Sequence, residues 1–149
     1  EDVGFVFQFY NLIADLTVEE NIQVVADIAE KPLPMDQVLE SLEIAQYRRR
    51  FPRELSGGQQ QRVAIARAMI KNPKLLLCDE LTGALDTHSS RTVLEAVEKM
   101  NREYGTTIVI ITHNEAISAM AHRIIWIKDG RIDRQEDKEH RTSAADLQL

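Results

Sequence analysis

Apolar residues recur along this chain with two different spacings, and these spacings predict its strands and helices. Short continuous apolar runs, such as those within residues 3–7 and 74–78, are typical of strands in a sheet. Longer segments repeat an apolar residue at every third or fourth position, which predicts helices with one buried face. Segments of the two kinds follow one another along the chain. We therefore expect an α/β fold with a mostly parallel sheet.

Capping residues, glycines and prolines set the ends of these elements. Thr17 and Ser56 are each followed three residues later by Glu or Gln, the pattern of a capping box that begins a helix. The strand at residues 74–78 does not alternate polar with apolar residues, so we expect it to be buried on both faces. The expected strands are residues 3–7, 74–78, 106–112, 124–128 and 131–133, and the expected helices are residues 18–30, 34–43, 57–71, 86–104 and 114–121.

The order of these elements predicts how the chain is organised. Residues 11–72 are helical without a predicted strand, so we expect them to form an α-helical subdomain inserted into a core. That core would consist of residues 1–10 and 73–133. The segment 134–149 is polar and is expected to be a mobile tail. Because an apolar strand begins at the third residue without a preceding cap, we expect the sequence to start inside a domain.

Composition and charge narrow the classes of function. The chain has 18 basic and 24 acidic residues, a net charge of −6, and so lacks the basic excess of nucleic-acid-binding proteins. Apolar runs reach four residues, against the roughly 20 of a membrane-spanning helix. The one cysteine, Cys78, excludes an internal disulfide and fits a reducing cytoplasm. The basic loop at residues 48–53 is expected to be a solvated turn, with contact to a nucleotide or partner as the alternative.

Two carboxylates follow the apolar run at residues 75–78. Asp79 and Glu80 would lie at the carboxyl end of a parallel strand, where open α/β sheets bind their ligands. One acid could hold Mg²⁺ while its neighbour polarises an attacking water molecule. The alternative is a buried strand whose end reaches the surface and carries acids for that reason alone.

A second candidate site lies at Ser56, Gly57 and Gly58, directly before a predicted helix. Two glycines remove the side chains from the helix mouth and would leave backbone N–H groups free to bind an anion. The Ser56 hydroxyl could cap the helix or donate to a phosphate oxygen, and these two uses compete. The alternative is a plain junction between loop and helix in which Ser56 only caps.

In combination, these segments resemble the motifs of ATP-binding-cassette (ABC) ATPases. Residues 55–59 (Leu-Ser-Gly-Gly-Gln) are similar to the signature motif of that family, and residues 75–80 to its Walker B motif. Gln8 resembles the Q-loop glutamine, residues 84–86 the D-loop and His113 the switch histidine. The resemblance covers residues 3–133 and is greatest to the macrolide-export and lipoprotein-release branch of bacterial exporters. It implies a P-loop NTPase (RecA-like) fold with an inserted helical subdomain.

The resemblance also implies a role for each matched residue. The family uses ATP and Mg²⁺, with the Walker B aspartate and the Q-loop glutamine at the metal. Glu80 would be the general base, and His113 would contact the γ-phosphate and link it to Glu80. The implied catalytic residues are Glu80 and His113, the implied ATP-binding residues Gln8, Ser56, Gly57, Gly58, Gln59 and Asp86, and the implied metal-binding residues Asp79 and Gln8.

The sequence departs from the family pattern in two places. Leu81 stands where the family usually has proline, and a looser loop there could misplace Glu80. The phosphate-binding pattern G-x-x-x-x-G-K-[ST] occurs nowhere in the 149 residues. We therefore expect the sequence to begin after the segment that grips the nucleotide, and to be inactive alone.

Partners follow from the same resemblance. The family pairs two ATPase domains head to tail, so a second copy is expected, together with a membrane-spanning subunit. The chain itself would be cytoplasmic and peripheral at the inner face of the plasma membrane. Residues 9–12 would anchor that subunit, or simply pack the two lobes together. Two other classes stay open: a non-catalytic interaction relic of a cassette, and a chromosome-maintenance or DNA-repair ATPase. Gln8 lies only 48 residues before Ser56, as in transporters, which disfavours the second.

Overall fold

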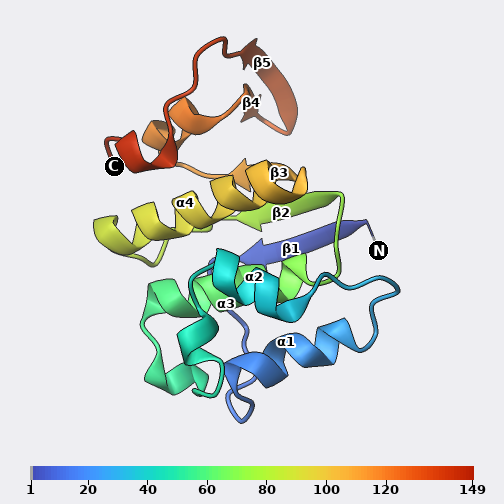
Figure 1. Cartoon of the computed structure of the whole chain (residues 1–149). Coiled ribbons are helices and arrows are strands. Elements are labelled where there is room, and N and C mark those ends of the chain that lie inside the picture. The colour runs from blue at the N-terminus through green and yellow to red at the C-terminus, as the bar shows by residue number, and fades with distance from the viewer. Residues whose placement is uncertain (1) are drawn as a thin grey trace.

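A three-stranded parallel sheet forms the centre of the fold. The computed structural model describes residues 2–149, in which β1 (Val3–Phe7), β2 (Leu75–Asp79) and β3 (Thr107–Ile111) are neighbours in that order. The pairing places Phe7 opposite Asp79, and Asp79 opposite Ile111. Because the strands are parallel and in register, all three end at the same edge of the sheet (Figure 1).

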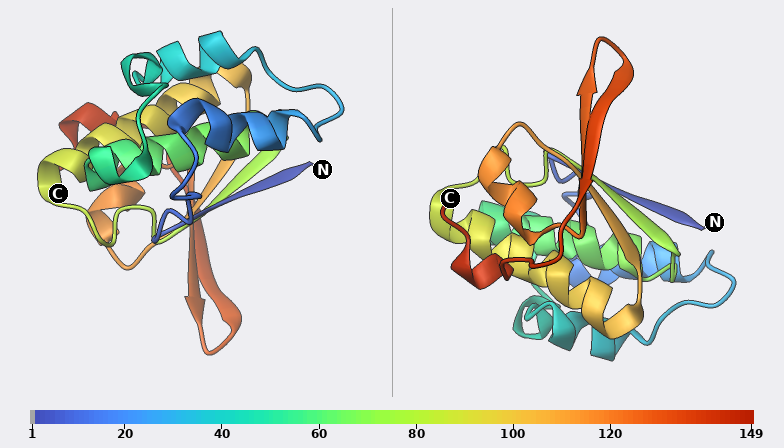
Figure 2. Two further views of the ribbon diagram at one scale, coloured as in Figure 1. Left: turned by 90° about the horizontal axis from the view of Figure 1, so that it is seen from below. Right: turned by 90° about the horizontal axis from the view of Figure 1, so that it is seen from above.

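Four α-helices lie on one side of this sheet, as the two views in Figure 2 show. They are α1 (Val18–Ala26), α2 (Met35–Ser41), α3 (Gly57–Met69) and α4 (Thr87–Tyr104). Helices α3 and α4 pack against the strands of the sheet, and α1 and α2 pack against those two helices. The core lies between these helices and the sheet, where Ile65, Leu76 and Leu94 are fully buried. Short 3₁₀ helices complete the chain at η1 (Ala45–Tyr47), η2 (Pro52–Glu54), η3 (Glu115–Met120) and η4 (Ala144–Asp146).

Both predicted capping boxes are present. The Thr17 side chain accepts a hydrogen bond from the Glu20 amide, and Ser56 does the same for Gln59. Helix α1 ends at Ala26 and not at residue 30, because Ile28 is 80% exposed and gives a further turn nothing to pack against. Between residues 11 and 72 the structure contains helices and no strand. Their division into a separate subdomain stays a prediction.

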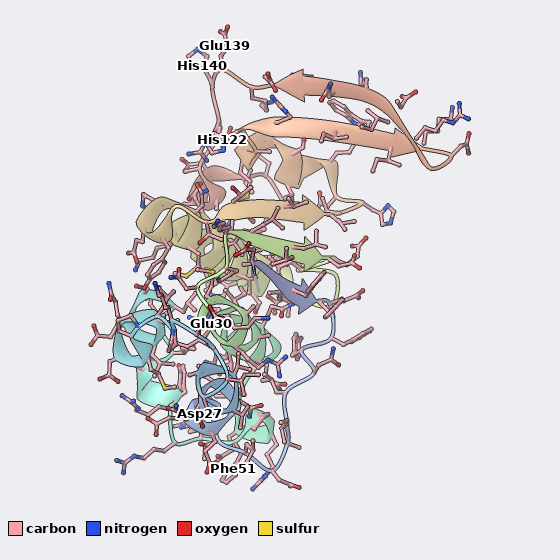
Figure 3. The ribbon with its side chains drawn as sticks, turned by 90° about the vertical axis from the view of Figure 1, so that its right-hand side faces the viewer. Asp27, Glu30, Phe51, His122, Glu139 and His140 are labelled. Atoms are coloured by element: carbon pink, nitrogen blue, oxygen red, sulfur yellow. The ribbon has the colours of Figure 1, made fainter. Side chains whose placement is uncertain are left out.

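The expectation of a mobile tail from Arg134 onward is wrong. Strand β5 (Arg131–Asp137) continues past residue 133 and pairs antiparallel with β4 (Arg123–Lys128). The chain then turns back near Glu139 and His140 (Figure 3), and Ala144 and Leu147 are buried.

Helix α4 holds this returning segment in place. The Nη1 atom of Arg91 donates to the carbonyls of Ala144, Ala145 and Leu147. The Glu98 carboxylate accepts a hydrogen bond from the Ala144 amide. The polar composition of the segment concealed these few anchoring contacts.

Within residues 2–149, β2 is not buried on both faces as predicted. Along β2 buried residues alternate with partly buried ones, and on the neighbouring strands Phe5 is 52% and Ile111 46% exposed. All four α-helices of residues 2–149 lie on one side of the sheet, so its other face is left partly exposed. No helix among these residues combines the length and apolarity needed to cross a bilayer.

Candidate functional site

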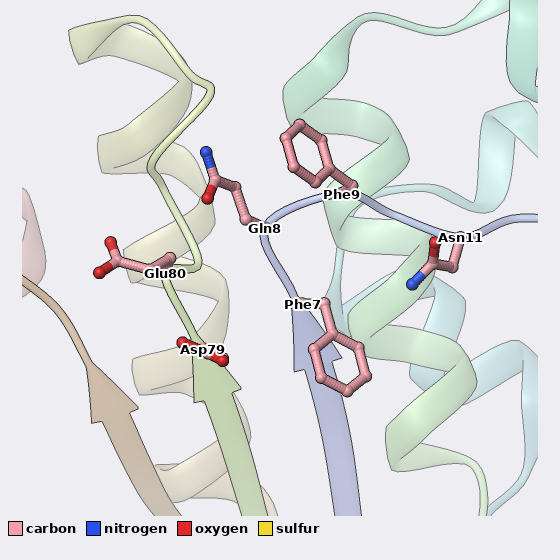
Figure 4. A pocket seen from close by; sticks show the side chains of 6 residues that line it. All are labelled: Phe7, Gln8, Phe9, Asn11, Asp79 and Glu80. Carbon is pink, nitrogen blue, oxygen red and sulfur yellow. The ribbon is translucent and has the colours of Figure 1, made fainter.

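The carboxyl edge of the sheet carries four of the residues singled out from the sequence. Gln8 follows β1, Asp79 ends β2 and Glu80 follows it, and His113 comes shortly after β3. A cavity of about 340 Å³ opens beside them (Figure 4). Its lining consists of Phe7, Gln8, Phe9, Asn11, Asp79 and Glu80. Strand order therefore brings together residues from three distant parts of the sequence.

Glu80 and His113 meet at this edge. The Nε2 atom of His113 lies 3.2 Å from Oε1 of Glu80, and the Glu80 side chain is 28% exposed. The His113 side chain is 96% exposed. The Glu80 carboxylate is partly buried and the imidazole beside it reaches into solvent. Together they can orient a water molecule toward an incoming substrate.

The backbone at Glu80 has an unusual conformation. Its φ angle is +53°, in the left-handed region that non-glycine residues rarely adopt. The Glu80 amide donates to the Ile111 carbonyl over 2.9 Å, and the Glu80 carbonyl accepts from the Gly83 amide over 3.0 Å. Leu81, where the sequence suggested a looser loop, is only 2% exposed. Burial of Leu81 thus anchors the turn that proline would otherwise stiffen.

The turn after β2 packs closely on Gln8. A Cβ atom added to Gly83 would lie 2.9 Å from both Cδ and Nε2 of the Gln8 side chain. Such an approach is closer than real Cβ contacts allow, so a larger residue at this position would displace the Gln8 amide. The turn and the Gln8 amide therefore form one packed unit beside Glu80.

The glycine pair that begins α3 has a packing role that the sequence did not reveal. A Cβ at Gly57 would lie 2.7 Å from the Tyr10 hydroxyl, and one at Gly58 would lie 3.1 Å from Cβ of Ser89. The Ser56 hydroxyl accepts the Gln59 amide over 3.2 Å, and Gln59 Oε1 accepts the Ser56 amide over 2.9 Å. Of its two possible uses, Ser56 therefore shows the capping one. This turn is not part of the cavity lining.

Asp86, the third residue of the D-loop match, is the N-cap of α4. Its Oδ1 accepts a hydrogen bond from the Ser89 amide over 2.7 Å. This hydrogen bond from the backbone holds the pKa of Asp86 below its ordinary value. The carboxylate is exposed at the start of the helix, where the helix dipole favours a negative charge.

Comparisons with known proteins agree with these motifs. The family model for ABC transporters matches residues 1–83, more than half of the chain. The chain belongs to the ABC transporter family. The predicted family and the predicted fold class are both confirmed, since solved ABC proteins share this fold.

Individual ABC relatives show how far the similarity extends. A putative ABC transporter ATP-binding protein of Mycoplasma pneumoniae, the MG467 homolog, is 45% identical over 88% of this chain and 40% of its own length. The macrolide export ATP-binding/permease protein MacB of Campylobacter jejuni is 48% identical over 93% of this chain and 22% of its own. This similarity agrees with the macrolide-export branch. The chain spans between 29% and 43% of the first three curated relatives.

Two solved ABC proteins share the fold. The ATP-binding cassette MJ0796 of Methanocaldococcus jannaschii, a dimer bound to ADP and Pi, superposes with a TM-score of 0.74 and 36% identity. The match covers 92% of this chain and 63% of that one. CbiO1 from Clostridium perfringens, part of the transporter complex cbiONQ, gives a TM-score of 0.82 at 29% identity over 91% and 57% of the two chains.

Arg67 is a residue of this ABC chain that the sequence analysis missed. Its guanidinium donates to the carbonyl of Asn11 over 2.8 Å and to that of Tyr10 over 3.0 Å. Burial lowers the pKa of Arg67. The two hydrogen bonds of Arg67 tie the segment after Gln8 to helix α3. An arginine between two alanines in the otherwise apolar stretch of residues 63–69 was the available signal.

The basic loop at residues 48–53 holds the helices of the ABC chain together. Arg48 donates to Glu19 and, over 2.9 Å, to Asp36, and the hydrogen bond to Glu19 raises the pKa of Arg48. The Arg53 guanidinium lies 4.8 Å from the ring centre of Phe51, at the lower end of Figure 3. These contacts support the interpretation as a structural turn over one as a nucleotide contact.

The oxygen atoms that line the cavity suit a hard cation whose remaining ligands are water and phosphate oxygens. Among the described residues, no three His, Cys, Asp or Glu side chains are placed to hold a metal ion together. Mg²⁺ commonly takes one or two protein oxygens and completes its shell with water and phosphate oxygens. Asp79 and the Gln8 amide oxygen fit this requirement, and both line the cavity.

Proposed function

We propose that these residues form part of an ABC transporter ATPase that couples ATP hydrolysis to export through a membrane-spanning partner. The observation that carries this proposal is the 3.2 Å contact between Glu80 and His113 at the edge where Asp79 and Gln8 also lie. Acid, imidazole and amide converge there from three separate strands. Phosphoryl transfer depends mainly on such positioning and on neutralising charge.

Each residue has a defined part in the proposed reaction. Glu80 takes a proton from the attacking water, and partial burial of its side chain keeps the carboxylate beside that water. His113, which reaches into solvent, contacts the γ-phosphate and orients Glu80. Asp79 and the Gln8 amide oxygen would hold Mg²⁺, which would supply positive charge to neutralise the phosphate oxygens.

The proposed ATP site needs a second polypeptide surface. The 149 residues contain no G-x-x-x-x-G-K-[ST] pattern, so the loop that grips the phosphates would come from outside them. In a head-to-tail pair, the turn at Ser56–Gly58 would close over the γ-phosphate held by the neighbour, with Asp86 at the seam. The dimeric state of the cassette MJ0796 supports this arrangement.

The segment after Gln8 offers a surface for the membrane partner. Phe9 is 68% and Ile13 49% exposed, whereas Tyr10 and Leu12 pack against the core. Phe9 and Ile13 would therefore contact the transporter subunit, while Tyr10 and Leu12 join the two lobes. We place the assembly in the cytoplasm, at the inner face of the membrane.

Hydrolysis by a completed cassette tests the proposal. The completed cassette is this sequence joined behind the phosphate-loop segment of a related ABC ATPase. It should hydrolyse ATP, and Glu80→Gln should abolish turnover, while Glu139→Gln, an exposed change far from the edge, should leave it unchanged. The 149 residues alone should show no turnover above their own Glu80→Gln control.

Two results would count against the proposal. Turnover by the 149 residues alone would show that no outside phosphate loop is needed. A folded completed cassette without Glu80-dependent turnover would favour the non-catalytic interaction module instead.

A further inference from the structure

Gln61 joins helix α3, which we call the signature helix, to the two loops that follow β1 and β2. It lies in α3, one turn after Gly57, and its side chain is fully buried. Its Nε2 atom donates to the Phe7 carbonyl over 2.9 Å and to the Leu81 carbonyl over 2.8 Å. Phe7 directly precedes Gln8, and Leu81 directly follows Glu80. One side chain thus holds the backbone beside both residues.

We propose that Gln61 is a positioning residue that fixes Gln8 and Glu80 relative to the signature helix. Its role in ATP hydrolysis rests on the proposed function, whereas its effect on the two loops does not. Neither the signature match nor the cavity lining includes Gln61, because it acts from beneath the site.

The chemistry of the site requires an amide at this position. Both groups that face Nε2 are backbone carbonyls, which accept hydrogen bonds and cannot donate, so the side chain must supply two N–H donors. A buried, neutral NH₂ group does this without the cost of a buried charge. The Oε1 atom of Gln61 is buried without a hydrogen-bond partner in the described structure. The two donated bonds offset that cost.

The left-handed backbone at Glu80 explains why such a tie is needed. A non-glycine residue at a φ of +53° is strained and persists only where its surroundings hold it. On one side, the Glu80 amide is held by the Ile111 carbonyl. On the other side, the Leu81 carbonyl is held by Gln61. Without Gln61, Glu80 can relax and leave His113.

A consequence follows for coupling between the two halves of an ATP site. A displacement of α3, such as one caused by a phosphate at Ser56–Gly58, is transmitted through Gln61 to the ends of β1 and β2. Gln8 and Glu80 then move together with the signature turn. Arg67, which ties the Tyr10 and Asn11 carbonyls to the same helix, reinforces the link at β1.

Hydrogen exchange on the 149-residue chain tests this inference without any nucleotide. Gln61→Met keeps the length of the side chain and removes both donors, and Gln60→Met on the same helix is the matched control. In the Gln61→Met variant the amides of Glu80 and Gly83 should exchange about tenfold faster or more, while α4 amides keep their rates. Gln60→Met should change neither set. Unchanged exchange at Glu80 and Gly83 in a folded Gln61→Met chain would overturn the inference.

A measurement on the unaltered chain covers the case in which Gln61→Met does not fold. The side-chain N–H protons of Gln61 should exchange with solvent far more slowly than those of Gln60, which lies partly exposed. Equal exchange of the two side-chain amides would show that the bonds to Phe7 and Leu81 do not hold, and would also overturn the inference.

The completed cassette then separates positioning from general stability. Gln61→Met should lower kcat roughly a hundredfold while KM for ATP stays within about threefold, since the phosphate grip is untouched. Equal losses in kcat for Gln61→Met and Gln60→Met would contradict the inference. If the unaltered completed cassette shows no turnover while exchange at Glu80 responds to Gln61→Met, the proposed function fails and the positioning stands.

Discussion

Ser56 allows its two possible uses, capping a helix and contacting phosphate, to be measured separately. Ser56→Ala removes the Oγ that accepts the Gln59 amide over 3.2 Å and leaves the reciprocal bond from the Ser56 amide to Gln59. Loss of an exposed N-cap acceptor costs about 1 kcal/mol. For a domain of about 150 residues this corresponds to a melting temperature lower by roughly 2–4 °C.

Ser56→Asp provides the opposite combination. Aspartate is as good an N-cap as serine, and its charge is favoured at the helix N-terminus, so the melting temperature should stay at or slightly above that of the unaltered chain. In the completed cassette, however, the same carboxylate would face the γ-phosphate of the neighbouring ATP. Repulsion between the two negative groups should reduce turnover much more than Ser56→Ala does.

Thermal unfolding followed by circular dichroism, combined with phosphate release by the completed cassette, gives both readouts. A Ser56→Ala melting temperature equal to that of the unaltered chain would refute the capping argument. Full turnover in Ser56→Asp would refute the argument that this turn faces a phosphate. Only the pairing of a stable, inactive aspartate variant with a less stable alanine variant supports both uses.

Three further predictions concern groups away from the signature turn. Burial raises the pKa of the Cys78 thiol to about 12, so iodoacetamide at pH 8 should leave native Cys78 unmodified and react only after denaturation. The hydrogen bond from Ser89 lowers the pKa of Asp86, so the carboxylate stabilises the fold above the ordinary pKa of 3.8 and loses this effect as the pH falls through the lower folded pKa. The difference in free energy of unfolding between the unaltered chain and Asp86→Ala, measured in urea, should shrink over that pH range. Arg67→Met should cost about 2 kcal/mol in urea unfolding, against less than about 0.5 kcal/mol for the exposed Arg102→Met, and equal costs would contradict the role of Arg67.

Local sequence patterns predicted the elements well where the chain determines its own structure over a few residues. The capping boxes at Thr17 and Ser56 and the strand at residues 3–7 are present as expected. Patterns misled where the partner of a residue lies elsewhere in the fold. The apolar run of β2 looked buried on two sides, yet helices cover one, and the polar segment after Arg134 concealed the buried Ala144 and Leu147.

The sequence by itself determined the family of this chain, its helix starts and the kinds of chemical group present, because motifs and caps depend on residues only a few positions apart. The tertiary structure alone decided that Glu80 and His113 lie 3.2 Å apart and that Gly57 and Gly83 pack closely on the side chains of Tyr10 and Gln8. It alone revealed Gln61 beneath both loops. The physical reason is that these contacts join residues separated by 20 to 75 positions, and only the parallel order β1–β2–β3, with α3 laid against it, brings their side chains within reach.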